Sequence, residues 1–450
     1  MIKDRKYLFL EDKNIYRAFM YLAFPVMVAN MFKSLHDMVD TYFIGQTANS
    51  VAAQAGISIT WPLYNLFMAL SVGMSVAGVS LISQYLGLKA EKRAREYASL
   101  LLILSAVIGV LFNLLLYFAS PAVMTWMGAE GAVYDAAVTY LKVRAFEMPF
   151  LFIFAAFQAI RQAKGDTTTP VILTIASIII NIILTAIFVK NFHMGVFGAA
   201  LATLIGQVLI VPPALYLIFS KKDSLHISFE TLKVRKKDVK ALLNIATPSA
   251  GSQAFSSLGF LILQAVILSY GESVSAAFSI GNKISNLLLI PVMALGSVLA
   301  AFVGQNIGAG NKKRAKESYI ASRNVAFGIT AVGSLLLFPL REPLIGLLTN
   351  DGETLRNAME YMLWVLLTQP LMALFQNYLG VFNGSGNTRF SFYMAITRLW
   401  LLRLPMILFM KNFTSFGHSG IWYAMVLSNL IIVFYGRYLL TKVKFIPKVN

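Results

Sequence analysis

Twelve separate runs of apolar residues, each long enough to cross a bilayer, constrain this chain more than any other feature. A transmembrane helix needs about 20 predominantly apolar residues, because each residue advances a helix by about 1.5 Å. With 58% hydrophobic and only 13% charged residues, the 450-residue chain is too apolar for a water-soluble protein of this size. The runs lie at residues 17–44, 52–80, 97–120, 134–158, 170–190, 195–219, 242–270, 278–304, 318–340, 356–380, 390–411 and 418–440. The sequence therefore predicts an all-α integral membrane protein with twelve transmembrane helices.

Lysine and arginine residues are concentrated in alternate segments between these runs. The opposite set of connecting segments holds only Lys190, Arg341, Arg356 and Lys411. Because basic residues favour the cytoplasmic side, this asymmetry predicts a multi-pass protein of the cell (inner or plasma) membrane with both termini in the cytoplasm. Topology thus accounts for the net charge of +18, and we expect no nucleic-acid partner.

The two halves of the chain share short motifs at a constant offset of 221 residues. The matches are QYLGLKAEKRAREY from Gln84 with QNIGAGNKKRAKES from Gln305, YLKVRAFEMP from Tyr140 with YMLWVLLTQP from Tyr361, and KGDT from Lys164 with SGNT from Ser385. Three matches at one offset predict two pseudo-symmetric six-helix bundles around a central cavity. Six is an even number, so both bundles have the same orientation in the membrane and are parallel repeats.

The repeat divides the chain into five parts. We expect a cytoplasmic tail at residues 1–14, an N-terminal bundle at 15–220, a cytoplasmic linker at 221–240, a C-terminal bundle at 241–440 and a second cytoplasmic tail at 441–450. Parallel repeats of this kind build secondary transporters, in which the two halves rock against each other. The sequence contains no cysteine and no recognisable nucleotide-binding loop, metal-ligand cluster or nucleophilic triad. We therefore predict that the protein is not an enzyme and uses no cofactor or tightly bound metal.

The first apolar run contains a stripe of ionisable residues. Lys33, His36, Asp37 and Asp40 occupy positions i, i+3, i+4 and i+7, so they share one face of a helix. A charge at the centre of a bilayer costs about 2.5–3.5 kcal/mol on insertion scales, so such residues usually face an aqueous cavity or a partner. Lys33 and Asp37 can neutralise each other, which leaves Asp40 without an obvious partner in its own helix. We predict that Asp40 is an ion-coupling residue; the alternative interpretation is an interfacial acid near a helix end.

Several motifs in this order resemble the multidrug and toxic compound extrusion (MATE) transporters. They are FP at Pro25, TP at Pro248, VDTYFIG ending the first helix, QYLG and QNIG before the basic loops, IRQAKGDTTTP at 160–170 and IIINIILTAIF at 178–188. The resemblance covers essentially the whole chain and is to the bacterial DinF-like or NorM-like type. It implies a monomeric secondary antiporter that exports organic cations and amphipathic drugs through the lipid bilayer. Protons or sodium ions would move in exchange, by alternating access.

Polar residues of the same half are expected to support Asp40. The predicted network consists of His36, Asp37, Gln158, Asn181, Thr185 and Thr203. By the resemblance, Asn181 matches the asparagine of helix 5 in the family, while Thr185 stands where one branch carries an aspartate. This departure favours protons over sodium, and a weak sodium site near Asp40 is the alternative. Isolated Asn and Thr residues in membrane helices also commonly hold helices together.

Soft and aromatic side chains suit a cavity that binds varied hydrophobic cations. The cavity candidates are Met31, Met38, Tyr42, Trp61, Tyr64, Phe154, Phe157, Gln253, Asn286 and Asn377. We interpret Glu147 and Arg144 as a structural ion pair. We expect Arg398 and Arg403 to snorkel or to pair with lipid phosphate, and the alternative is that they line the cavity. The alternative function is a flippase for a lipid-linked saccharide or another amphipathic lipid. The two acids in the first helix favour cationic cargo instead.

Overall fold

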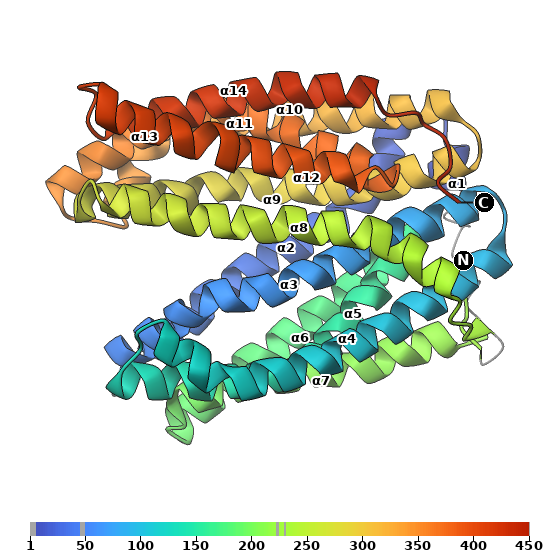
Figure 1. Cartoon of the computed structure of the whole chain (residues 1–450), viewed down its shortest axis with the longest axis horizontal. Helices are drawn as coiled ribbons and strands as arrows, with labels where there is room; N and C mark the ends of the chain where they lie inside the picture. The colour runs from blue at the N-terminus through green and yellow to red at the C-terminus, as the bar shows by residue number, and fades with distance from the viewer. Residues whose placement is uncertain (1–5, 46–49, 222–224, 229–230, 450) are drawn as a thin grey trace.

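The computed structural model contains the twelve predicted membrane spans (Figure 1). It describes residues 6–45, 50–221, 225–228 and 231–449, without the side chains at 6, 37, 38, 40, 41, 50 and 51. All regular elements in this described part are helical, and twelve spans of them are long and apolar enough to cross a membrane. The predicted fold class is therefore confirmed.

The spans form two bundles of six, preceded by a short helix, α1 (Lys6–Leu10). The first bundle consists of α2 (Ile15–Gly45), α3 (Ser50–Gly87), α4 (Glu91–Trp126), α5 (Gly131–Ala163), α6 (Thr168–Ala186) with the π-helical η1 (Ile187–Asn191), and α7 (Gly195–Phe219). The second consists of α8 (Lys236–Leu268), α9 (Glu272–Gly308), α10 (Lys312–Gly346), α11 (Gly352–Gly384), α12 (Thr388–Ile396) continued by the π-helical η3 (Thr397–Arg403) and α13 (Leu404–Phe413), and α14 (Ser419–Thr441).

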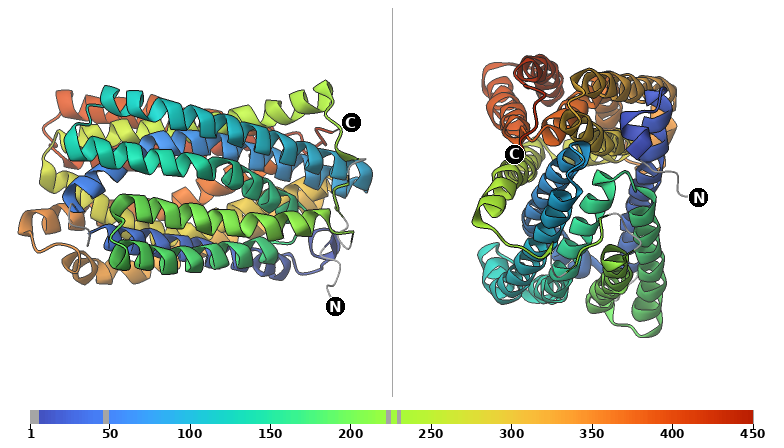
Figure 2. Two further views of the ribbon diagram at one scale, coloured as in Figure 1. Left: turned by 90° about the horizontal axis from the view of Figure 1, so that it is seen from below. Right: turned by 90° about the vertical axis from the view of Figure 1, so that its right-hand side faces the viewer.

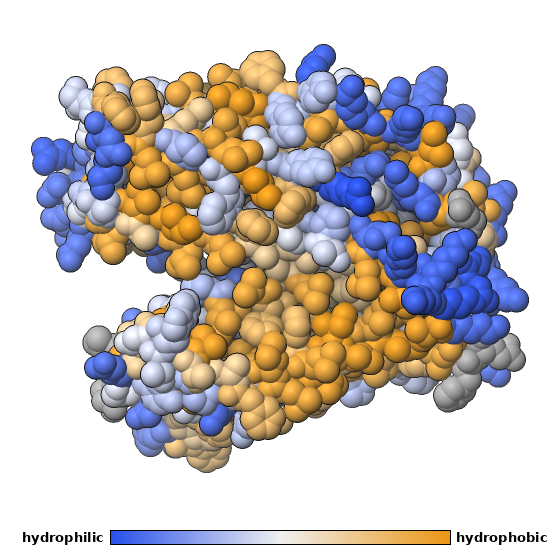
Figure 3. All heavy atoms as spheres, in the orientation of Figure 1, coloured by the Kyte–Doolittle hydropathy of each residue, from blue (hydrophilic) through white to orange (hydrophobic). Residues whose placement is uncertain are grey.

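The two bundles meet at one end of the molecule and separate at the other (Figure 1). Both chain termini lie at the end where the bundles meet, which we call the terminal end; the opposite end is the open end. The views along and across the helices in Figure 2 show the same two groups. Apolar side chains cover the middle of the molecule and hydrophilic ones gather at both ends, most densely at the terminal end (Figure 3). This distribution is the one expected for a protein that spans a membrane.

Several helices extend beyond the apolar runs that predicted them. The run at 52–80 belongs to α3, which has 38 residues and continues to Gly87 at the terminal end. Its counterpart α9 has 37 residues and ends at Gly308. These extensions bring the QYLG and QNIG motifs of the two repeats into contact across the boundary between the bundles.

Backbone packs directly on backbone where α3 and α9 approach each other. A Cβ atom added at Gly87 would lie 2.1 Å from the carbonyl oxygen of Gln305, and one added at Gly308 would lie 2.1 Å from that of Gln84. The two contacts are related by the same offset of 221 residues that relates the two halves of the sequence. Only glycine permits this approach, because any side chain would overlap a backbone atom that cannot rotate away.

Two glutamines repeat this symmetry in their hydrogen bonds. The side-chain amide of Gln84 donates to the carbonyl oxygen of Gly384 at 3.1 Å, and that of Gln305 donates to the carbonyl oxygen of Ala163 at 2.6 Å. Gly384 and Ala163 are again equivalent positions of the two repeats. Each bundle therefore binds the last turn of a helix in the other bundle, and the terminal end is closed from both sides.

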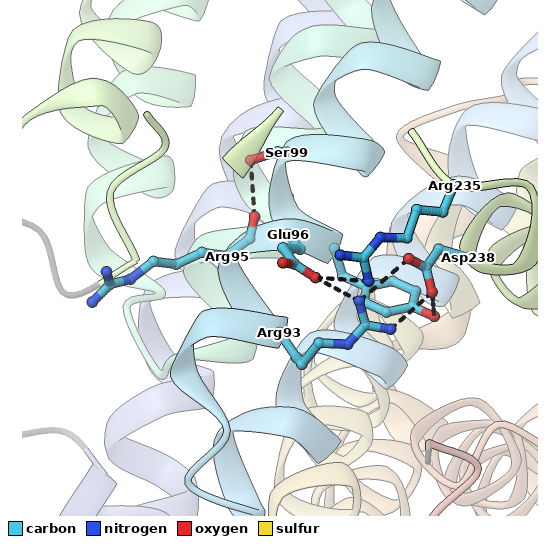
Figure 4. A network of polar contacts seen from close by, with 7 residues as sticks. Arg93, Arg95, Glu96, Ser99, Arg235 and Asp238 are labelled. Carbon is cyan, nitrogen blue, oxygen red and sulfur yellow. Dashed lines mark hydrogen bonds and ion pairs between the residues drawn. The ribbon is translucent and has the colours of Figure 1, made fainter. Parts of the chain in front are cut away.

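A network of ionised groups fastens α4 to the start of α8 at the same end (Figure 4). Arg93 Nη2 lies 2.8 Å from Asp238 Oδ1, and the hydroxyl of Tyr97 donates to the same oxygen at 3.0 Å. Glu96 contacts Arg93 and lies 3.7 Å from Arg235. Arg93, Tyr97 and Glu96 belong to the first bundle, whereas Arg235 and Asp238 lead into the second. The network thus spans the boundary between the bundles.

The equivalent arginine of the second repeat makes the reciprocal connection. Arg314 Nε donates to the carbonyl oxygen of Phe9 at 2.7 Å, and its Nη2 donates to that of Asp12 at 2.8 Å. Asn306 adds a hydrogen bond of 3.1 Å to the carbonyl oxygen of Phe9. Each repeat therefore uses the arginine of its basic loop to hold the chain that enters the other bundle.

We expect Asp238→Asn to loosen the terminal end. Losing the charge-assisted bonds from Arg93 costs about 1.5–3 kcal/mol, which corresponds to roughly a 10- to 150-fold shift toward the open form of this end. The chain has no native cysteine, so a cysteine introduced by Ser80→Cys can report accessibility by its rate of thiol labelling. Ser80 is fully buried between the bundles and contacts Gly384. Glu317→Gln, which removes an exposed pair within α10, should leave the rate unchanged. Equal rates in the two variants would contradict the role of Asp238.

Candidate functional site

A cavity of about 610 Å³ lies between the two bundles. Its wall is formed by α2, α3, α5, α6 and α7 of the first bundle and by α9 and α11 of the second. Figure 3 shows that the surface is hollowed between the bundles at the open end. The contacts of Gln84 and Gln305 close the terminal end, so the cavity opens toward the other end of the molecule.

A chain of hydrogen bonds joins three helices of the first bundle at the cavity wall. His36 Nε2 on α2 lies 2.7 Å from Asn181 Oδ1 on α6, and the amide of Asn181 donates to Thr203 on α7 at 2.9 Å. Thr185, one turn beyond Asn181, donates to the same Oδ1 at 3.5 Å. The predicted residues His36, Asn181, Thr185 and Thr203 are thus brought together. Gln158 also lines the cavity and donates to Thr174 at 3.3 Å.

The predicted coupling residue lies on the same helix as His36. The backbone of Asp37, Met38 and Asp40 belongs to α2, but the side chains of these residues lie outside the described residues. Their roles in coupling and in the cavity therefore stay predictions. Among the described residues, no group of three or more His, Asp or Glu side chains could hold a metal ion.

The structure separates the other cavity candidates by the faces of their helices. Phe154 lines the cavity, whereas Phe157, one turn further along α5, is fully buried within the bundle. Tyr64 is buried beneath the guanidinium of Arg144, whose centre lies 4.4 Å from the ring. Asn377 is buried in the second bundle, where it accepts a hydrogen bond from Ser322. These positions take Phe157, Tyr64 and Asn377 out of the cavity wall.

The remaining candidates are exposed and also lie outside the wall of this cavity. They are Met31, Tyr42, Trp61, Gln253 and Asn286. The wall instead contains Lys33, Arg144 and Glu147. The ion pair predicted between Arg144 and Glu147 is present, with 2.9 Å between Nη1 and Oε2, but it faces the cavity. Its position was visible in the sequence as an acid two residues before Pro149, inside an apolar span.

The prediction for two arginines of the second bundle is wrong. Arg398 and Arg403 do not reach lipid phosphate, because both are buried where η3 packs on α11 and α14. Arg403 Nε donates to Ser428 at 3.1 Å, and the guanidinium of Arg398 lies 4.5 Å from the centre of the Phe375 ring. Among the described residues, neither forms an ion pair with an acid. Neutral polar and aromatic groups therefore hold these two charges inside the bundle.

Comparison with known proteins agrees with this architecture. A NorM protein of Thermotoga maritima, described as a probable multidrug resistance protein, is 27% identical over 92% of this chain and 90% of its own length. The multidrug export protein MepA of Staphylococcus saprophyticus is 24% identical over 96% and 94% of the two chains. A solved MATE family transporter in an outward-facing conformation superposes with a TM-score of 0.91 at 22% identity, covering 99% of each chain. The family model described as MatE matches residues 25–187 and 248–409, one match in each bundle. This chain therefore belongs to the MATE family of membrane transporters.

Proposed function

We propose that this protein exports organic cations and amphipathic drugs across the cell membrane in exchange for protons. The observation that carries the proposal is a cavity between two parallel repeats, closed at the terminal end by the contacts of Gln84 and Gln305 and open at the other (Figure 3). Such a cavity can present its cargo to either side when the bundles rock. The names of the relatives, a probable multidrug resistance protein and a multidrug export protein, support drugs as cargo.

Orientation follows from the basic segments. Arg93, Lys236 and Arg314 lie at the terminal end with both chain termini, and basic residues favour the cytoplasm. The cavity then opens to the outside, and the structure corresponds to the state that releases exported cargo. In the opposite state, the contacts of Gln84 and Gln305 would separate so that cargo enters from the cytoplasm. The cycle needs one chain and no cofactor.

Coupling is assigned to Asp40, with the network around His36 and Asn181 as its support. The hydrogen bonds from α2 to α6 and from α6 to α7 connect the helix of Asp40 to the rest of its bundle. A carboxyl group that exchanges a proton with the cavity can change how these helices pack, because its charge is lost when it binds the proton. Sodium coupling is the alternative, with side-chain oxygens of the same network as ligands.

A lipid flippase is the second candidate function. Lys33 and Arg144 are cations in the described cavity wall, and positive charge of this kind would suit a lipid-linked saccharide with an anionic headgroup. The acids Asp37 and Asp40 on the same helix as Lys33 argue for cationic cargo.

An efflux assay separates these candidates. In a cell that lacks its own drug exporters, expression should lower the accumulation of ethidium or a fluoroquinolone several-fold, and a protonophore should restore it. Removing external sodium while the pH gradient is kept should have no effect. If a broad panel of cationic compounds accumulates as in cells with the empty vector, drug export is wrong and the flippase is favoured.

A further inference from the structure

One acid in the cavity wall has no role in the proposed coupling through Asp40. Glu147 lies on α5, one turn after Arg144, and the two residues are only 3% and 8% exposed. Both line the cavity between the bundles. Among the described residues of that wall, Glu147 is the only carboxylate. Ionisable residues inside membrane spans are costly to insert, so one that faces a transport cavity points to function.

The carboxylate of Glu147 has acceptor positions that no described hydrogen bond fills. Arg144 Nη1 lies 2.9 Å from Oε2, yet this oxygen receives no aligned hydrogen bond from any donor in the described part of the chain. A carboxylate offers about four acceptor positions, so the guanidinium of Arg144 and the hydroxyl of Tyr64 together leave room for another cation or for a proton. This acceptor is buried in the present state, so a cation in the cavity reaches it only when the side chain of Glu147 turns into the cavity.

Arg144 has other contacts that hold it in place. The centre of its guanidinium lies 4.4 Å from the ring of Tyr64 on α3 and 5.7 Å from the ring of Tyr140 on α5. Cation–π attraction to these rings does not depend on the charge of Glu147. Arg144 can therefore keep its position while Glu147 changes its partner.

The surroundings of Glu147 are otherwise basic or neutral in the described structure. Arg144, Tyr64 and His36 act directly on Glu147, Tyr140 contacts Arg144, and Lys33 of α2 lines the same cavity. The cavity-lining residues of α6, α7, α9 and α11 include no titratable side chain. On α4, which also packs against α5, Tyr117 contacts Lys142. The charge of this part of the wall therefore depends on whether Glu147 is ionised.

We propose that Glu147 binds a proton and the positive group of an organic cation in turn, so that the two compete for one carboxylate. This inference rests on the proposed function. A proton arriving from the open end forms an O–H bond on the carboxylate, and no other covalent bond changes. The charge of Arg144 then loses its counterion, the wall becomes more positive, and a cationic cargo is repelled to the outside. When the cavity opens to the cytoplasm, the proton leaves and the carboxylate is available for the next cation.

The competition between proton and cation can be measured because their binding equilibria are thermodynamically linked. If a proton on Glu147 weakens cation binding, a bound cation must weaken proton binding by the same factor. The affinity for ethidium should then fall as the pH falls. The slope of the logarithm of the dissociation constant against pH counts the protons that one cation displaces.

The test measures ethidium binding to the purified protein between pH 5.5 and 8.5. Glu147→Gln should weaken binding about tenfold at pH 8 and reduce the slope by up to one proton. The double variant Arg144→Gln/Glu147→Gln restores the net charge of the wall, so it should recover much of the affinity but none of the lost slope. Glu360→Gln is a matched control, because Glu360 pairs with His418 outside the cavity and should bind ethidium as the wild type does.

The outcomes separate this inference from the proposed function. If the wild type neither binds nor exports ethidium, the proposed function fails, and this inference fails with it. If the wild type does both and Glu147→Gln keeps the full slope, only the role of Glu147 is overturned. A purely structural ion pair predicts that Glu147→Gln lowers the melting temperature and that the double variant restores both the melting temperature and the wild-type slope.

Discussion

Replacing Gly87 or Gly308 with alanine should abolish transport by preventing the terminal end from closing. A methyl group at either position would lie 2.1 Å from a backbone carbonyl oxygen of the opposite bundle, and backbone cannot rotate away as a side chain can. The helices α3 and α9 must then separate, and the hydrogen bonds of Gln84 and Gln305 are lost with the contact. We expect the protein to insert and fold, because each glycine contacts the other bundle rather than its own.

Thiol labelling and efflux together check this prediction. With the cysteine of Ser80→Cys as the reporter, labelling from the cytoplasmic side should become fast in both glycine variants, while ethidium efflux falls to the level of the empty vector. Gly328→Ala is the matched control, because nothing lies within 4 Å of a Cβ atom at that position in α10. Normal efflux in the Gly87→Ala variant would show that the two bundles do not close by this contact.

Neutralising Asp40 to asparagine should abolish gradient-driven export and leave the protein folded. The amide keeps the size of the side chain but cannot exchange a proton, so a pH gradient has no carboxyl to act on at this position. Cells that express Asp40→Asn should accumulate ethidium as cells with the empty vector do. The melting temperature and the amount of protein in the membrane should match those of the wild type.

Two further variants serve as controls for this result. Asp40→Glu keeps a titratable carboxyl group and should retain part of the export activity. Asp135→Asn changes an exposed aspartate near the open end of α5 and should export normally. Wild-type efflux by Asp40→Asn would move the coupling to another group, and Glu147 would be the first to examine.

The fold could be predicted because the features that determine it can be found along the sequence, without knowing which side chains contact each other. Hydropathy locates the spans, the basic segments predict their direction, and a constant offset reveals the repeat. The offset also proved to have a physical meaning, since Gln84 and Gln305 bind equivalent carbonyl groups across the bundle boundary. The ends of helices such as α3 were less predictable, because beyond the bilayer a helix continues for as long as its partner helix covers it.

Side-chain direction limited the prediction of the site. His36, Asn181 and Thr203 were grouped correctly, because polar residues in apolar spans have few positions in which they can find partners. Phe154 and Phe157 were not distinguished, since a membrane helix that is apolar on every face gives no sign of which face meets a cavity. The positions of Arg398 and Arg403 were missed for a related reason: sequence separates an arginine at a lipid surface from one inside a bundle only when its partners are known.

The last residues of the described chain have a consequence for how the protein is made. The backbone N–H of Lys448 donates to Gln84 Oε1 at 2.8 Å, across 364 residues of sequence. Lys448 follows α14, the last span of the second bundle, so Gln84 gains this partner only after both bundles have been synthesised. A chain truncated after α14 would therefore lack one of the hydrogen bonds that Gln84 makes at the terminal end.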